Sequence, residues 1–413
     1  MTRVIHTGDT HIGYRQYHSP DRQADFFAAF EQVIDDAIDL DVDAIVHAGD
    51  LFHNTRPAIP DLMQTVSALR RLARADIPFL GIVGNHEATS DRQWLDLFSD
   101  LDLAIRLDSD GYELHDVTLY GLDYVPPTQR ERIDYDFATP DTTYTALVAH
   151  GLFEPFAHAD WDTAALLDAA TVAFDALLLA DNHSPGQTEI ADTWITYCGS
   201  TERASAAERE HRGYNLVTFD DGVRITRRQL TGIREWVFVD VTLAGTEGTE
   251  HVITEATAYD VADAVVIVRV SGDGSDISPA TIEEQLDDSG ALLTRVIDER
   301  ALPDRDIHQV SFADPDRAVR ERLRSTSISE AGSLIDAVVR DKNIPDSGVR
   351  DRIETRIETL LHERPEAFER RSDSAAADTD AETDEPRMDV DSDQSNDNPD
   401  NNGDGQRSIA EFG

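Results

Sequence analysis

The sequence predicts an α/β fold for residues 1–230. Short apolar segments with strand character alternate there with longer segments whose apolar residues recur at helical spacing. Five of the apolar segments end abruptly in Asp, Asn or His, at 4–13, 43–50, 78–87, 144–151 and 175–183. Ligands of open α/β sheets collect at the carboxyl ends of the strands. The endings therefore predict a binding site as well as a fold.

The helices and the remaining strands follow from the spacing of apolar residues. Amphipathic helices are expected over 24–40, 61–75 and 91–100, where residues such as Phe30, Ile34 and Leu69 fall on one face. These stripes are interpreted as core and are assigned no chemistry. Later apolar segments at 116–122, 194–198 and 214–219 suggest a second sheet packed on the first.

The polar residues that end the five segments are of a restricted kind. Asp9 and His11 stand two residues apart, and in an extended chain such side chains point the same way. Alone, this pair would be read as an Asp turn with a surface His. Five such endings are hard to assign to chance, and the others supply a further set of side chains: Asp50, Asn85, His86, His150, Asp181 and His183.

This set of side chains is suited to divalent metal ions. Carboxylates, imidazoles and an amide oxygen, with no thiolate, fit manganese, iron, zinc or magnesium. The ligands are too many for one ion and right for two ions that share a bridging carboxylate. Two ions about 3.5–4 Å apart clamp the attacking and leaving oxygens of a phosphoryl displacement. The residues thus predict metal-assisted phosphoester hydrolysis.

The motifs resemble those of a known family. Asp-x-His at 9–11, Gly-Asp-Leu-Phe-His at 49–53, Gly-Asn-His-Glu at 84–87, the single His150 and Asn-His at 182–183 resemble the calcineurin-like metallophosphoesterases. Segments 11–17, 49–57 and 197–203 are similar to the SbcD/Mre-eleven repair nucleases. The resemblance implies a calcineurin-like sandwich of two packed sheets flanked by helices, a small α+β capping domain and C-terminal helices. It also implies a DNA exonuclease/endonuclease subunit of a double-strand-break repair complex.

The resemblance also implies roles for individual residues. One Mn2+ would be held by Asp9, His11, Asp50 and His183, and a second by Asp50, Asn85, His150 and Asp181. His86 matches the catalytic imidazole that stabilises or protonates the leaving group, and His53 matches a histidine that supports the phosphate site. Asp181 stands where the family usually has the first His of His-x-His. A carboxylate there adds negative charge, which favours a harder ion such as manganese.

The composition points to an unusual environment. The chain has 36 Lys+Arg against 82 Asp+Glu, for a net charge of -46, and Lys342 is its single lysine. A large net charge keeps protein soluble, so this surface is interpreted as adaptation to the high-salt cytoplasm of a halophilic archaeon. A disordered acidic chain is excluded by the apolar strands. The lone Cys198 excludes a disulfide framework. Neither a signal segment nor a membrane-spanning run is recognised, so a cytoplasmic protein without a membrane partner is expected.

DNA contacts are expected near the first metal motif and in an Arg-rich stretch. Tyr14, Tyr17 and His18 follow that motif, and Arg203 opens the stretch 203–234, where basic residues exceed acidic ones. Contacts of Tyr17 and His18 with DNA and plain loop packing remain open alternatives. The Arg-rich stretch is either a phosphate-binding surface or a set of Arg residues paired with nearby acids. Because the Debye length near 1 M salt is about 3 Å, binding would depend on close Arg–phosphate and metal–phosphate contacts.

The second half of the chain divides by composition. Residues 231–312 predict a small α+β module, with strands at 236–243, 264–270 and 292–297 and a helix at 279–288. By resemblance this module is the capping domain. Residues 313–365 predict partner-binding helices; by resemblance the partner is a coiled-coil SMC-like ATPase (Rad-fifty). A helical extension packed on its own domain is the alternative. Residues 366–405 read as a disordered acidic linker. The terminal segment 406–413 resembles a sliding-clamp (PCNA) binding box, with Gln406, Ile409 and Phe412.

The expected substrate is DNA, as double-strand ends, hairpins and single-strand overhangs, acted on by a homodimer. Two rival functions remain. One is a metallophosphatase of small phosphoesters, which the capping-like segment and the partner helices argue against. The other is a DNA-end scaffold that seldom uses its nuclease, which the complete ligand set argues against.

Overall fold

The computed structural model describes residues 1–89 and 92–300, together with isolated residues between 329 and 364. The predicted linker 366–405 and clamp-binding segment 406–413 lie outside the described residues, as do 301–312 and most of 313–365. Within 313–365, the described residues 331–332 and 359–362 are helical. Among the described residues, no helix has the length and apolar character needed to cross a membrane.

The first sheet contains three of the five polar-ended strands. Its six strands run in the order β12-β11-β1-β2-β3-β4. They are β1 (Thr2–Thr7), β2 (Ala44–His47), β3 (Phe79–Gly81), β4 (Ile105–Arg106), β11 (Gly213–Phe219) and β12 (Val223–Gln229). Strands β1 to β4 are parallel, with Thr7 beside His47 and His47 beside Gly81. Their carboxyl ends are therefore level, which brings the following residues to one edge.

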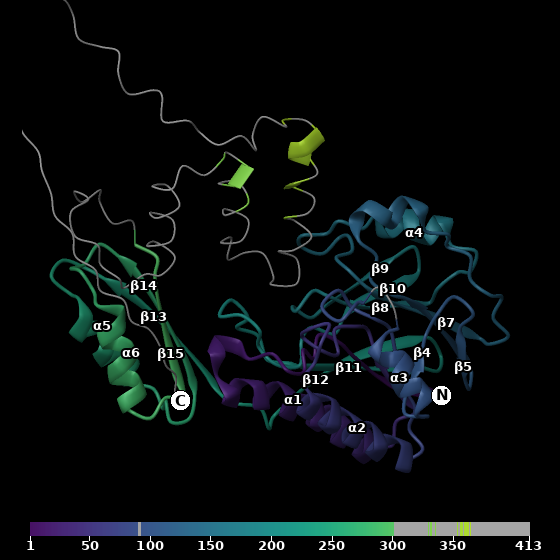
Figure 1. The fold of residues 1–413 in the computed structure, drawn as a ribbon, viewed down its shortest axis with the longest axis horizontal. Helices are drawn as coiled ribbons and strands as arrows, with labels where there is room; N and C mark the ends of the chain where they lie inside the picture. Colours follow the sequence, from purple (N-terminus) through teal and green to yellow (C-terminus); the bar gives the residue numbers. More distant parts are fainter. Residues whose placement is uncertain are drawn as a thin grey trace, which may run out of the picture. The chain divides into compact units, whose positions relative to one another are not determined.

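Three helices cover the outer face of this sheet, as Figure 1 shows for α1 and α2. They are α1 (Pro20–Leu40), α2 (Ile59–Arg74) and α3 (Trp94–Asp100). Helix α1 begins four residues before the prediction, because Ser19 caps it by accepting a hydrogen bond from the Arg22 amide and Pro20 fits the first turn. It ends where Asp41 takes a left-handed conformation.

The second sheet contains the other two polar-ended strands. Its order is β5-β6-β7-β8-β10-β9, from β5 (Tyr112–Leu114), β6 (Val117–Leu122), β7 (Tyr144–His150), β8 (Ala176–Ala180), β9 (Gly186–Ile190) and β10 (Thr193–Tyr197). Strands β6, β7, β8 and β10 are parallel. Helix α4 (Thr163–Ala169) packs its Leu166 side chain against the outer face of this second sheet. The short 3-10 helix η2 spans Pro127–Arg132.

This arrangement corrects the prediction in one respect. Segment 214–219 was expected in the second sheet, but β11 pairs antiparallel with β1 in the first. Conversely, β7 and β8 belong to the second sheet although they end in ligands like β1. Apolar runs show that a strand is buried but do not specify its neighbour, so the sheet to which each strand belongs could not be read from the sequence.

The two sheets pack face to face, as the family resemblance implies. Val4 and Val46 of the first sheet share a core with Val148 and Leu178 of the second, whereas Ile5 faces the helices. Both Val4 and Ile5 are fully buried. Strands covered on both faces must be apolar throughout, which explains why the segments read as continuous apolar runs.

Residues 236–298 form a three-stranded parallel sheet with two helices, hereafter the three-stranded module. Its elements are β13 (Trp236–Leu243), α5 (Thr249–Ala256), β14 (Val265–Gly272), α6 (Pro279–Asp288) and β15 (Leu293–Asp298). One face packs on α5 and α6, and the other carries Trp236 and Ile267 against Tyr17 and Ala206. The expected strands and the helix at 279–288 are present, whereas α5 was not foreseen.

Candidate metal centre

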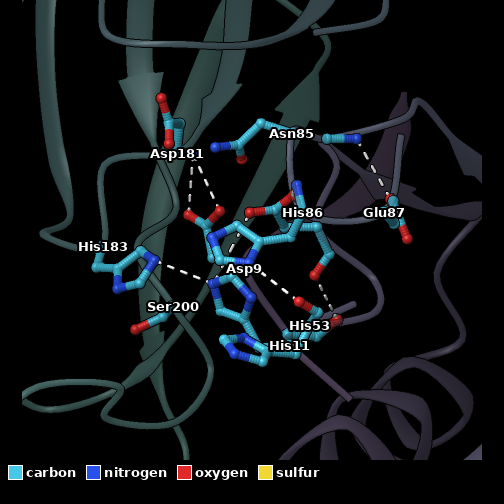
Figure 2. Close-up of polar contacts among 12 residues, drawn as sticks. Asp9, His11, His53, Asn85, His86, Glu87, Asp181, His183 and Ser200 are labelled. Carbon is cyan, nitrogen blue, oxygen red and sulfur yellow. Dashed lines mark hydrogen bonds and ion pairs between the residues drawn. The ribbon is translucent and has the colours of Figure 1, made fainter. Parts of the chain in front are cut away.

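The polar residues that end or follow β1, β2, β3, β7 and β8 converge on one site. Figure 2 shows Asp9, Asn85, Asp181 and His183 of this set. Backbone hydrogen bonds fasten the loops together, from the Asp9 amide to the Gly49 carbonyl (3.1 Å) and from the His11 amide to the Asp50 carbonyl (3.0 Å). The loops can approach this closely only because Gly84 has no side chain, since a Cβ there would lie 2.1 Å from Asp50 Oδ1.

Four of the predicted ligands have a left-handed backbone. The φ angles are 47° at Asp9, 44° at His11, 56° at Asp50 and 92° at Asp181. Such angles are uncommon outside glycine but are most accessible to Asp, Asn and His. Strained backbone of this kind clusters at functional sites. Here it turns the chain sharply at the strand end, so that the side chains face inward.

One group of side chains gathers around His11 and His183. The two Nε2 atoms are 3.1 Å apart, and His11 Nε2 lies 3.9 Å from Asp50 Oδ2. Ligand atoms of Asp9, His11 and His183 all lie within 4.8 Å of one another, and all three residues are buried. This group corresponds to the first predicted metal position.

A second group surrounds His150. Its Nε2 atom lies 3.1 Å from Asn85 Oδ1, 3.6 Å from Asp50 Oδ2 and 3.8 Å from Asp181 Oδ1. Asp50 Oδ2 is buried, accepts no hydrogen bond from any described residue, and faces both groups. An unshared carboxylate oxygen between two sets of donors is the arrangement that a bridging ligand requires. The residues therefore fit two metal ions, as predicted.

Hydrogen bonds on the far side of two rings fix which nitrogen faces the site. His150 Nδ1 lies 2.8 Å from the Ala48 carbonyl oxygen, and His183 Nδ1 lies 2.8 Å from Glu208 Oε1. Each acceptor holds a proton on Nδ1, so that in the neutral ring, the form that binds a metal ion, the Nε2 lone pair is directed at the centre. This is how histidine ligands of metal ions are commonly held.

The electrostatics of the centre favour a cation. Burial raises the pKa of the Asp9 carboxyl to about 6, although His183 and His150 lower it. Burial lowers the pKa of the His150 imidazole, but nearby carboxylates led by Asp50 outweigh it and raise that pKa to about 9. Protons on these groups supply the positive charge that buried carboxylates need. Divalent ions can supply the same charge.

His86 and His53 lie beside this centre and are half-buried. The His86 amide donates to Asp50 Oδ1 (2.9 Å), and His86 Nδ1 lies 3.0 Å from the His53 carbonyl oxygen. The His53 ring stacks on Tyr14, with centroids 3.9 Å apart and an interplanar angle of 23°. The backbone thus ties His86 to the bridging carboxylate, while its ring remains partly accessible.

The other predicted DNA contacts have different surroundings. Tyr17 packs beside the three-stranded module, with the Arg295 guanidinium 5.0 Å from its ring centroid, which favours the loop-packing alternative. His18 is exposed. Arg203 is 6% exposed, and its Nε donates to the Glu208 carbonyl oxygen at 2.9 Å. Contact of Arg203 with DNA stays a prediction that its burial argues against.

Three of the seven Arg residues in the Arg-rich stretch form ion pairs with acids. Arg209 forms a two-pronged ion pair with Asp240, Arg212 pairs with Glu208, and Arg234 pairs with Asp25. For these residues the structure favours the second alternative, in which the Arg residues neutralise nearby acids and do not form an open phosphate-binding surface.

Sequence reasoning missed the residues that support the ligands. Glu87 accepts hydrogen bonds from the Phe52 amide (3.0 Å) and the Gly84 amide (3.3 Å), and burial raises its pKa to about 7. Glu208 supports His183. Glu87 belongs to the Gly-Asn-His-Glu motif, which could have identified it. Glu208 belongs to none of the recognised motifs. Only its contact with His183 in the folded protein reveals its supporting role.

Comparisons with known proteins agree with this geometry. The calcineurin-like phosphoesterase family matches residues 2–205. The DNA double-strand break repair protein Mre11 of Haloferax volcanii is 53% identical over 92% of this chain and 88% of its own length. The protein of that name from Halobacterium salinarum is 51% identical over 89% of this chain and 96% of its own length.

A more distant relative extends the match beyond haloarchaea. The DNA double-strand break repair protein Mre11 of Methanosarcina mazei is 41% identical over 87% of this chain and 60% of its own length. The family match over residues 2–205 includes all the predicted metal ligands. The chain therefore belongs to the Mre11 family, within the calcineurin-like phosphoesterases.

Proposed function

We propose that this protein hydrolyses phosphodiester bonds at DNA ends, as the nuclease subunit of a double-strand-break repair complex. The observation that carries the proposal is the convergence of the ligands of two metal positions on Asp50, with His86 bound to the same carboxylate. The haloarchaeal relatives are named for DNA double-strand break repair, which favours DNA over small phosphoesters as the substrate.

Two bound metal ions would activate water and neutralise charge on the phosphate. Asp9, His11, Asp50 and His183 would hold one, and Asp50, Asn85, His150 and Asp181 the other. We propose Mn2+ as the physiological ion, because four of these seven side chains offer oxygen and Asp181 contributes a carboxylate. Metal dependence of the variant Asp181→His tests this choice. Its activity with zinc should rise relative to manganese, and an unchanged preference would contradict the proposal.

His86 would act on the leaving group. Its Nδ1 proton is bound to the His53 carbonyl, so Nε2 is the ring atom available to the reacting phosphate. The imidazole can donate a proton to the departing sugar oxygen, or a hydrogen bond that stabilises its charge. His53, stacked on Tyr14, would flank the phosphate and limit how a DNA strand can enter.

Digestion of DNA tests the proposed activity directly. End-labelled duplex, hairpin and single-strand-overhang substrates are incubated with the full chain and manganese at high salt, with and without the ATPase partner. Cleavage that exceeds hydrolysis of a p-nitrophenyl phosphodiester is expected. Preferential hydrolysis of the small ester would favour the metallophosphatase. Metal binding without cleavage under any condition would favour the end-binding scaffold.

We also propose that the protein works as a homodimer through α2 and α3. Both helices cover the same face of the first sheet. Apolar side chains are exposed one turn apart on α2, at Ile59 and Met63, and at the end of α3, at Leu97 and the C-cap residue Leu101. Apolar residues at such spacing on neighbouring helices suit a helix-to-helix interface. Light scattering should show dissociation of Met63→Glu but not of Tyr259→Glu, which changes an exposed residue in the three-stranded module. A monomeric wild type would contradict the proposal.

Two further partners are proposed from segments outside the described residues. Co-purification with the coiled-coil ATPase should require residues 313–365. A peptide of residues 400–413 should bind the sliding clamp at high salt through Gln406, Ile409 and Phe412. No saturable binding of the peptide would leave the tail without a role in clamp binding.

A further inference from the structure

Glu208 is a carboxylate outside both groups of predicted metal ligands, and its side chain is 10% exposed. Its Oε1 accepts the Nδ1 proton of His183 at 2.8 Å. An ionised carboxylate can only accept, so it holds this proton on Nδ1. In the neutral ring the lone pair is therefore on His183 Nε2, which lies 3.1 Å from His11 Nε2. The contact selects the tautomer that can bind a metal ion.

The second oxygen of Glu208 is held just as closely. Oε2 accepts from the Ala204 amide at 3.1 Å and from Arg212 Nη1 at 3.2 Å. Arg212 is 1% exposed, and the same Nη1 donates to the His183 carbonyl oxygen at 2.8 Å. One guanidinium therefore fixes both the backbone of the ligand and the carboxylate that orients its ring. Neither can rotate independently of the other.

The loop that carries Glu208 is also held by the three-stranded module. Arg209 pairs with Asp240 of β13, and Arg269 of β14 donates to the Ala206 carbonyl oxygen at 3.2 Å. Like Ala206, Arg203 precedes Glu208 in the chain, and its guanidinium lies 5.8 Å from the ring centroid of Trp236. Residues on both sides of Glu208 thus contact the module. The contacts between the module and this loop therefore help to fix the position of the Glu208 carboxylate.

We propose that Glu208 is a positioning residue for His183, and that the three-stranded module holds it in place, so that the module tunes the affinity of the metal position that contains His183. This rests on the two-metal centre of the proposed function. The competing explanation is that Glu208 only neutralises Arg212 in the folded protein. That explanation predicts a change in stability without a change in metal affinity.

Calorimetric titration of the full metal-free chain with Mn2+ separates the two explanations. In Glu208→Gln the amide keeps the shape but is a weaker acceptor and can turn its NH2 toward His183. One of the two binding steps should weaken about 10–100-fold, the usual effect of removing such a partner, while the other changes little. Electron paramagnetic resonance should show loss of the spin-coupled manganese pair at metal concentrations that fill both positions in the wild type.

A matched control removes the same charge two residues away. Glu210 is exposed, and only its backbone carbonyl is bonded to Arg212. Glu210→Gln should bind both ions with wild-type affinity, which excludes a general effect of lost negative charge. Wild-type affinities in a folded Glu208→Gln would overturn the proposal. Failure of the wild type to bind Mn2+ at all would instead overturn the proposed function.

The wild-type protein offers a test that does not depend on the folding of a variant at Glu208. Long-range 15N–1H spectra of the Zn2+-loaded, histidine-labelled protein report the tautomer of each ring. The proposal requires His183 to carry its proton on Nδ1, and a proton on Nε2 would overturn it. The His183→Gln spectrum assigns the signal.

The part played by the module is tested at Asp240. Asp240→Ala removes the partner of Arg209 on an exposed surface and should weaken the same binding step several-fold. Combined with Glu208→Gln, it should add nothing, because the effect passes through a contact already lost. An additive effect, or none in the single variant, would show that the module does not act through Glu208.

Discussion

The two sheets within residues 1–230, hereafter the nuclease domain, and the three-stranded module are built alike but end differently. Both contain neighbouring parallel strands that contribute apolar side chains to a buried core. Strands β1, β2 and β8 are followed by Asp9, Asp50 and Asp181, each with a left-handed backbone. Strand β13 is followed by Ala244 and a glycine. Among the described residues, every group of side chains able to hold a metal lies in the nuclease domain.

The difference shows which features turn the end of a strand into a binding site. The carboxyl edge of a parallel sheet is available in both regions, and so is a buried core beneath it. Acids also follow β14 and β15 of the module, as Asp273 and Glu299. Among the described residues, however, only the nuclease domain gathers acids and histidines into groups able to hold a metal, with glycines such as Gly84 where the loops touch. The edge permits a site, and the few residues that follow each strand create it.

Substitution of the bridging carboxylate should have the largest effect. Asp50→Asn removes the charge that both metal positions share, so Mn2+ binding should be lost or reduced to one weak site. DNA cleavage should fall about 1,000-fold or more, because a metal supplies several kcal/mol of transition-state stabilisation. Calorimetry and digestion of end-labelled DNA measure both quantities.

The control lies at the other end of the same strand. Asp43 precedes β2 and accepts a hydrogen bond from the Arg3 amide. Asp43→Asn should keep both ions and full cleavage. Equal losses in the two variants would break the comparison, since the end of the strand would then not matter.

His86→Gln should separate chemistry from metal binding. The side chain is not among the predicted ligands, so two Mn2+ ions should still bind. Cleavage should fall about 100- to 10,000-fold, the usual contribution of a positioned acid–base group. Pre-steady-state cleavage with metal saturation gives the rate. Loss of one ion in this variant would make His86 a ligand, as its closeness to His11 and His53 would then imply.

A cavity in the three-stranded module should cost stability and spare the metal centre. Leu286 of α6 is fully buried against the module's sheet. Leu286→Ala should lower the free energy of unfolding by about 2–5 kcal/mol, measured in urea, while both Mn2+ affinities stay within a few-fold. Tyr259→Ala, at an exposed position of the same module, should change stability far less. Loss of metal binding in folded Leu286→Ala would mean that the two regions are not separable.

The smallest effects should be equal in the two regions. Ser19 caps α1 in the nuclease domain and Ser278 caps α6 in the module, each by accepting a hydrogen bond from an amide three residues on. Replacement of either by Ala should cost about 1 kcal/mol. Urea unfolding of both variants checks this. A much larger loss at Ser19 would show that its helix does more than support the sheet.

Much of the fold and of the metal centre was predictable from the sequence, because both depend on patterns of residues that lie close together in the chain. Apolar runs identify strands, and Asp9, Asp50 and His183 follow them within a few residues. The prediction of a calcineurin-like sandwich is confirmed by the sheets and the family match. The pairing of β11 with β1 was not predictable, because nothing in an apolar run specifies its neighbour.

The contacts that support the site could not be predicted from the sequence, for a related reason. Arg22 and Glu202 form a fully buried ion pair at 3.0 Å, although 180 residues separate them in the chain. Glu208 reaches His183 across a loop. Before folding, such residues look like any other charge in a chain with 82 acids. Only the three-dimensional structure distinguishes them.

The left-handed backbone at Asp181 constrains how this centre can evolve. A φ of 92° disfavours β-branched and bulky residues. The side chains that tolerate such angles best, after glycine, are Asn, Asp and His, and each can donate an oxygen or a nitrogen to a cation. Mutation at this position can therefore exchange an imidazole for a carboxylate without a change in the backbone conformation. If Asp181 is a ligand as proposed, drift here would change which ion is preferred more readily than it would abolish the donor.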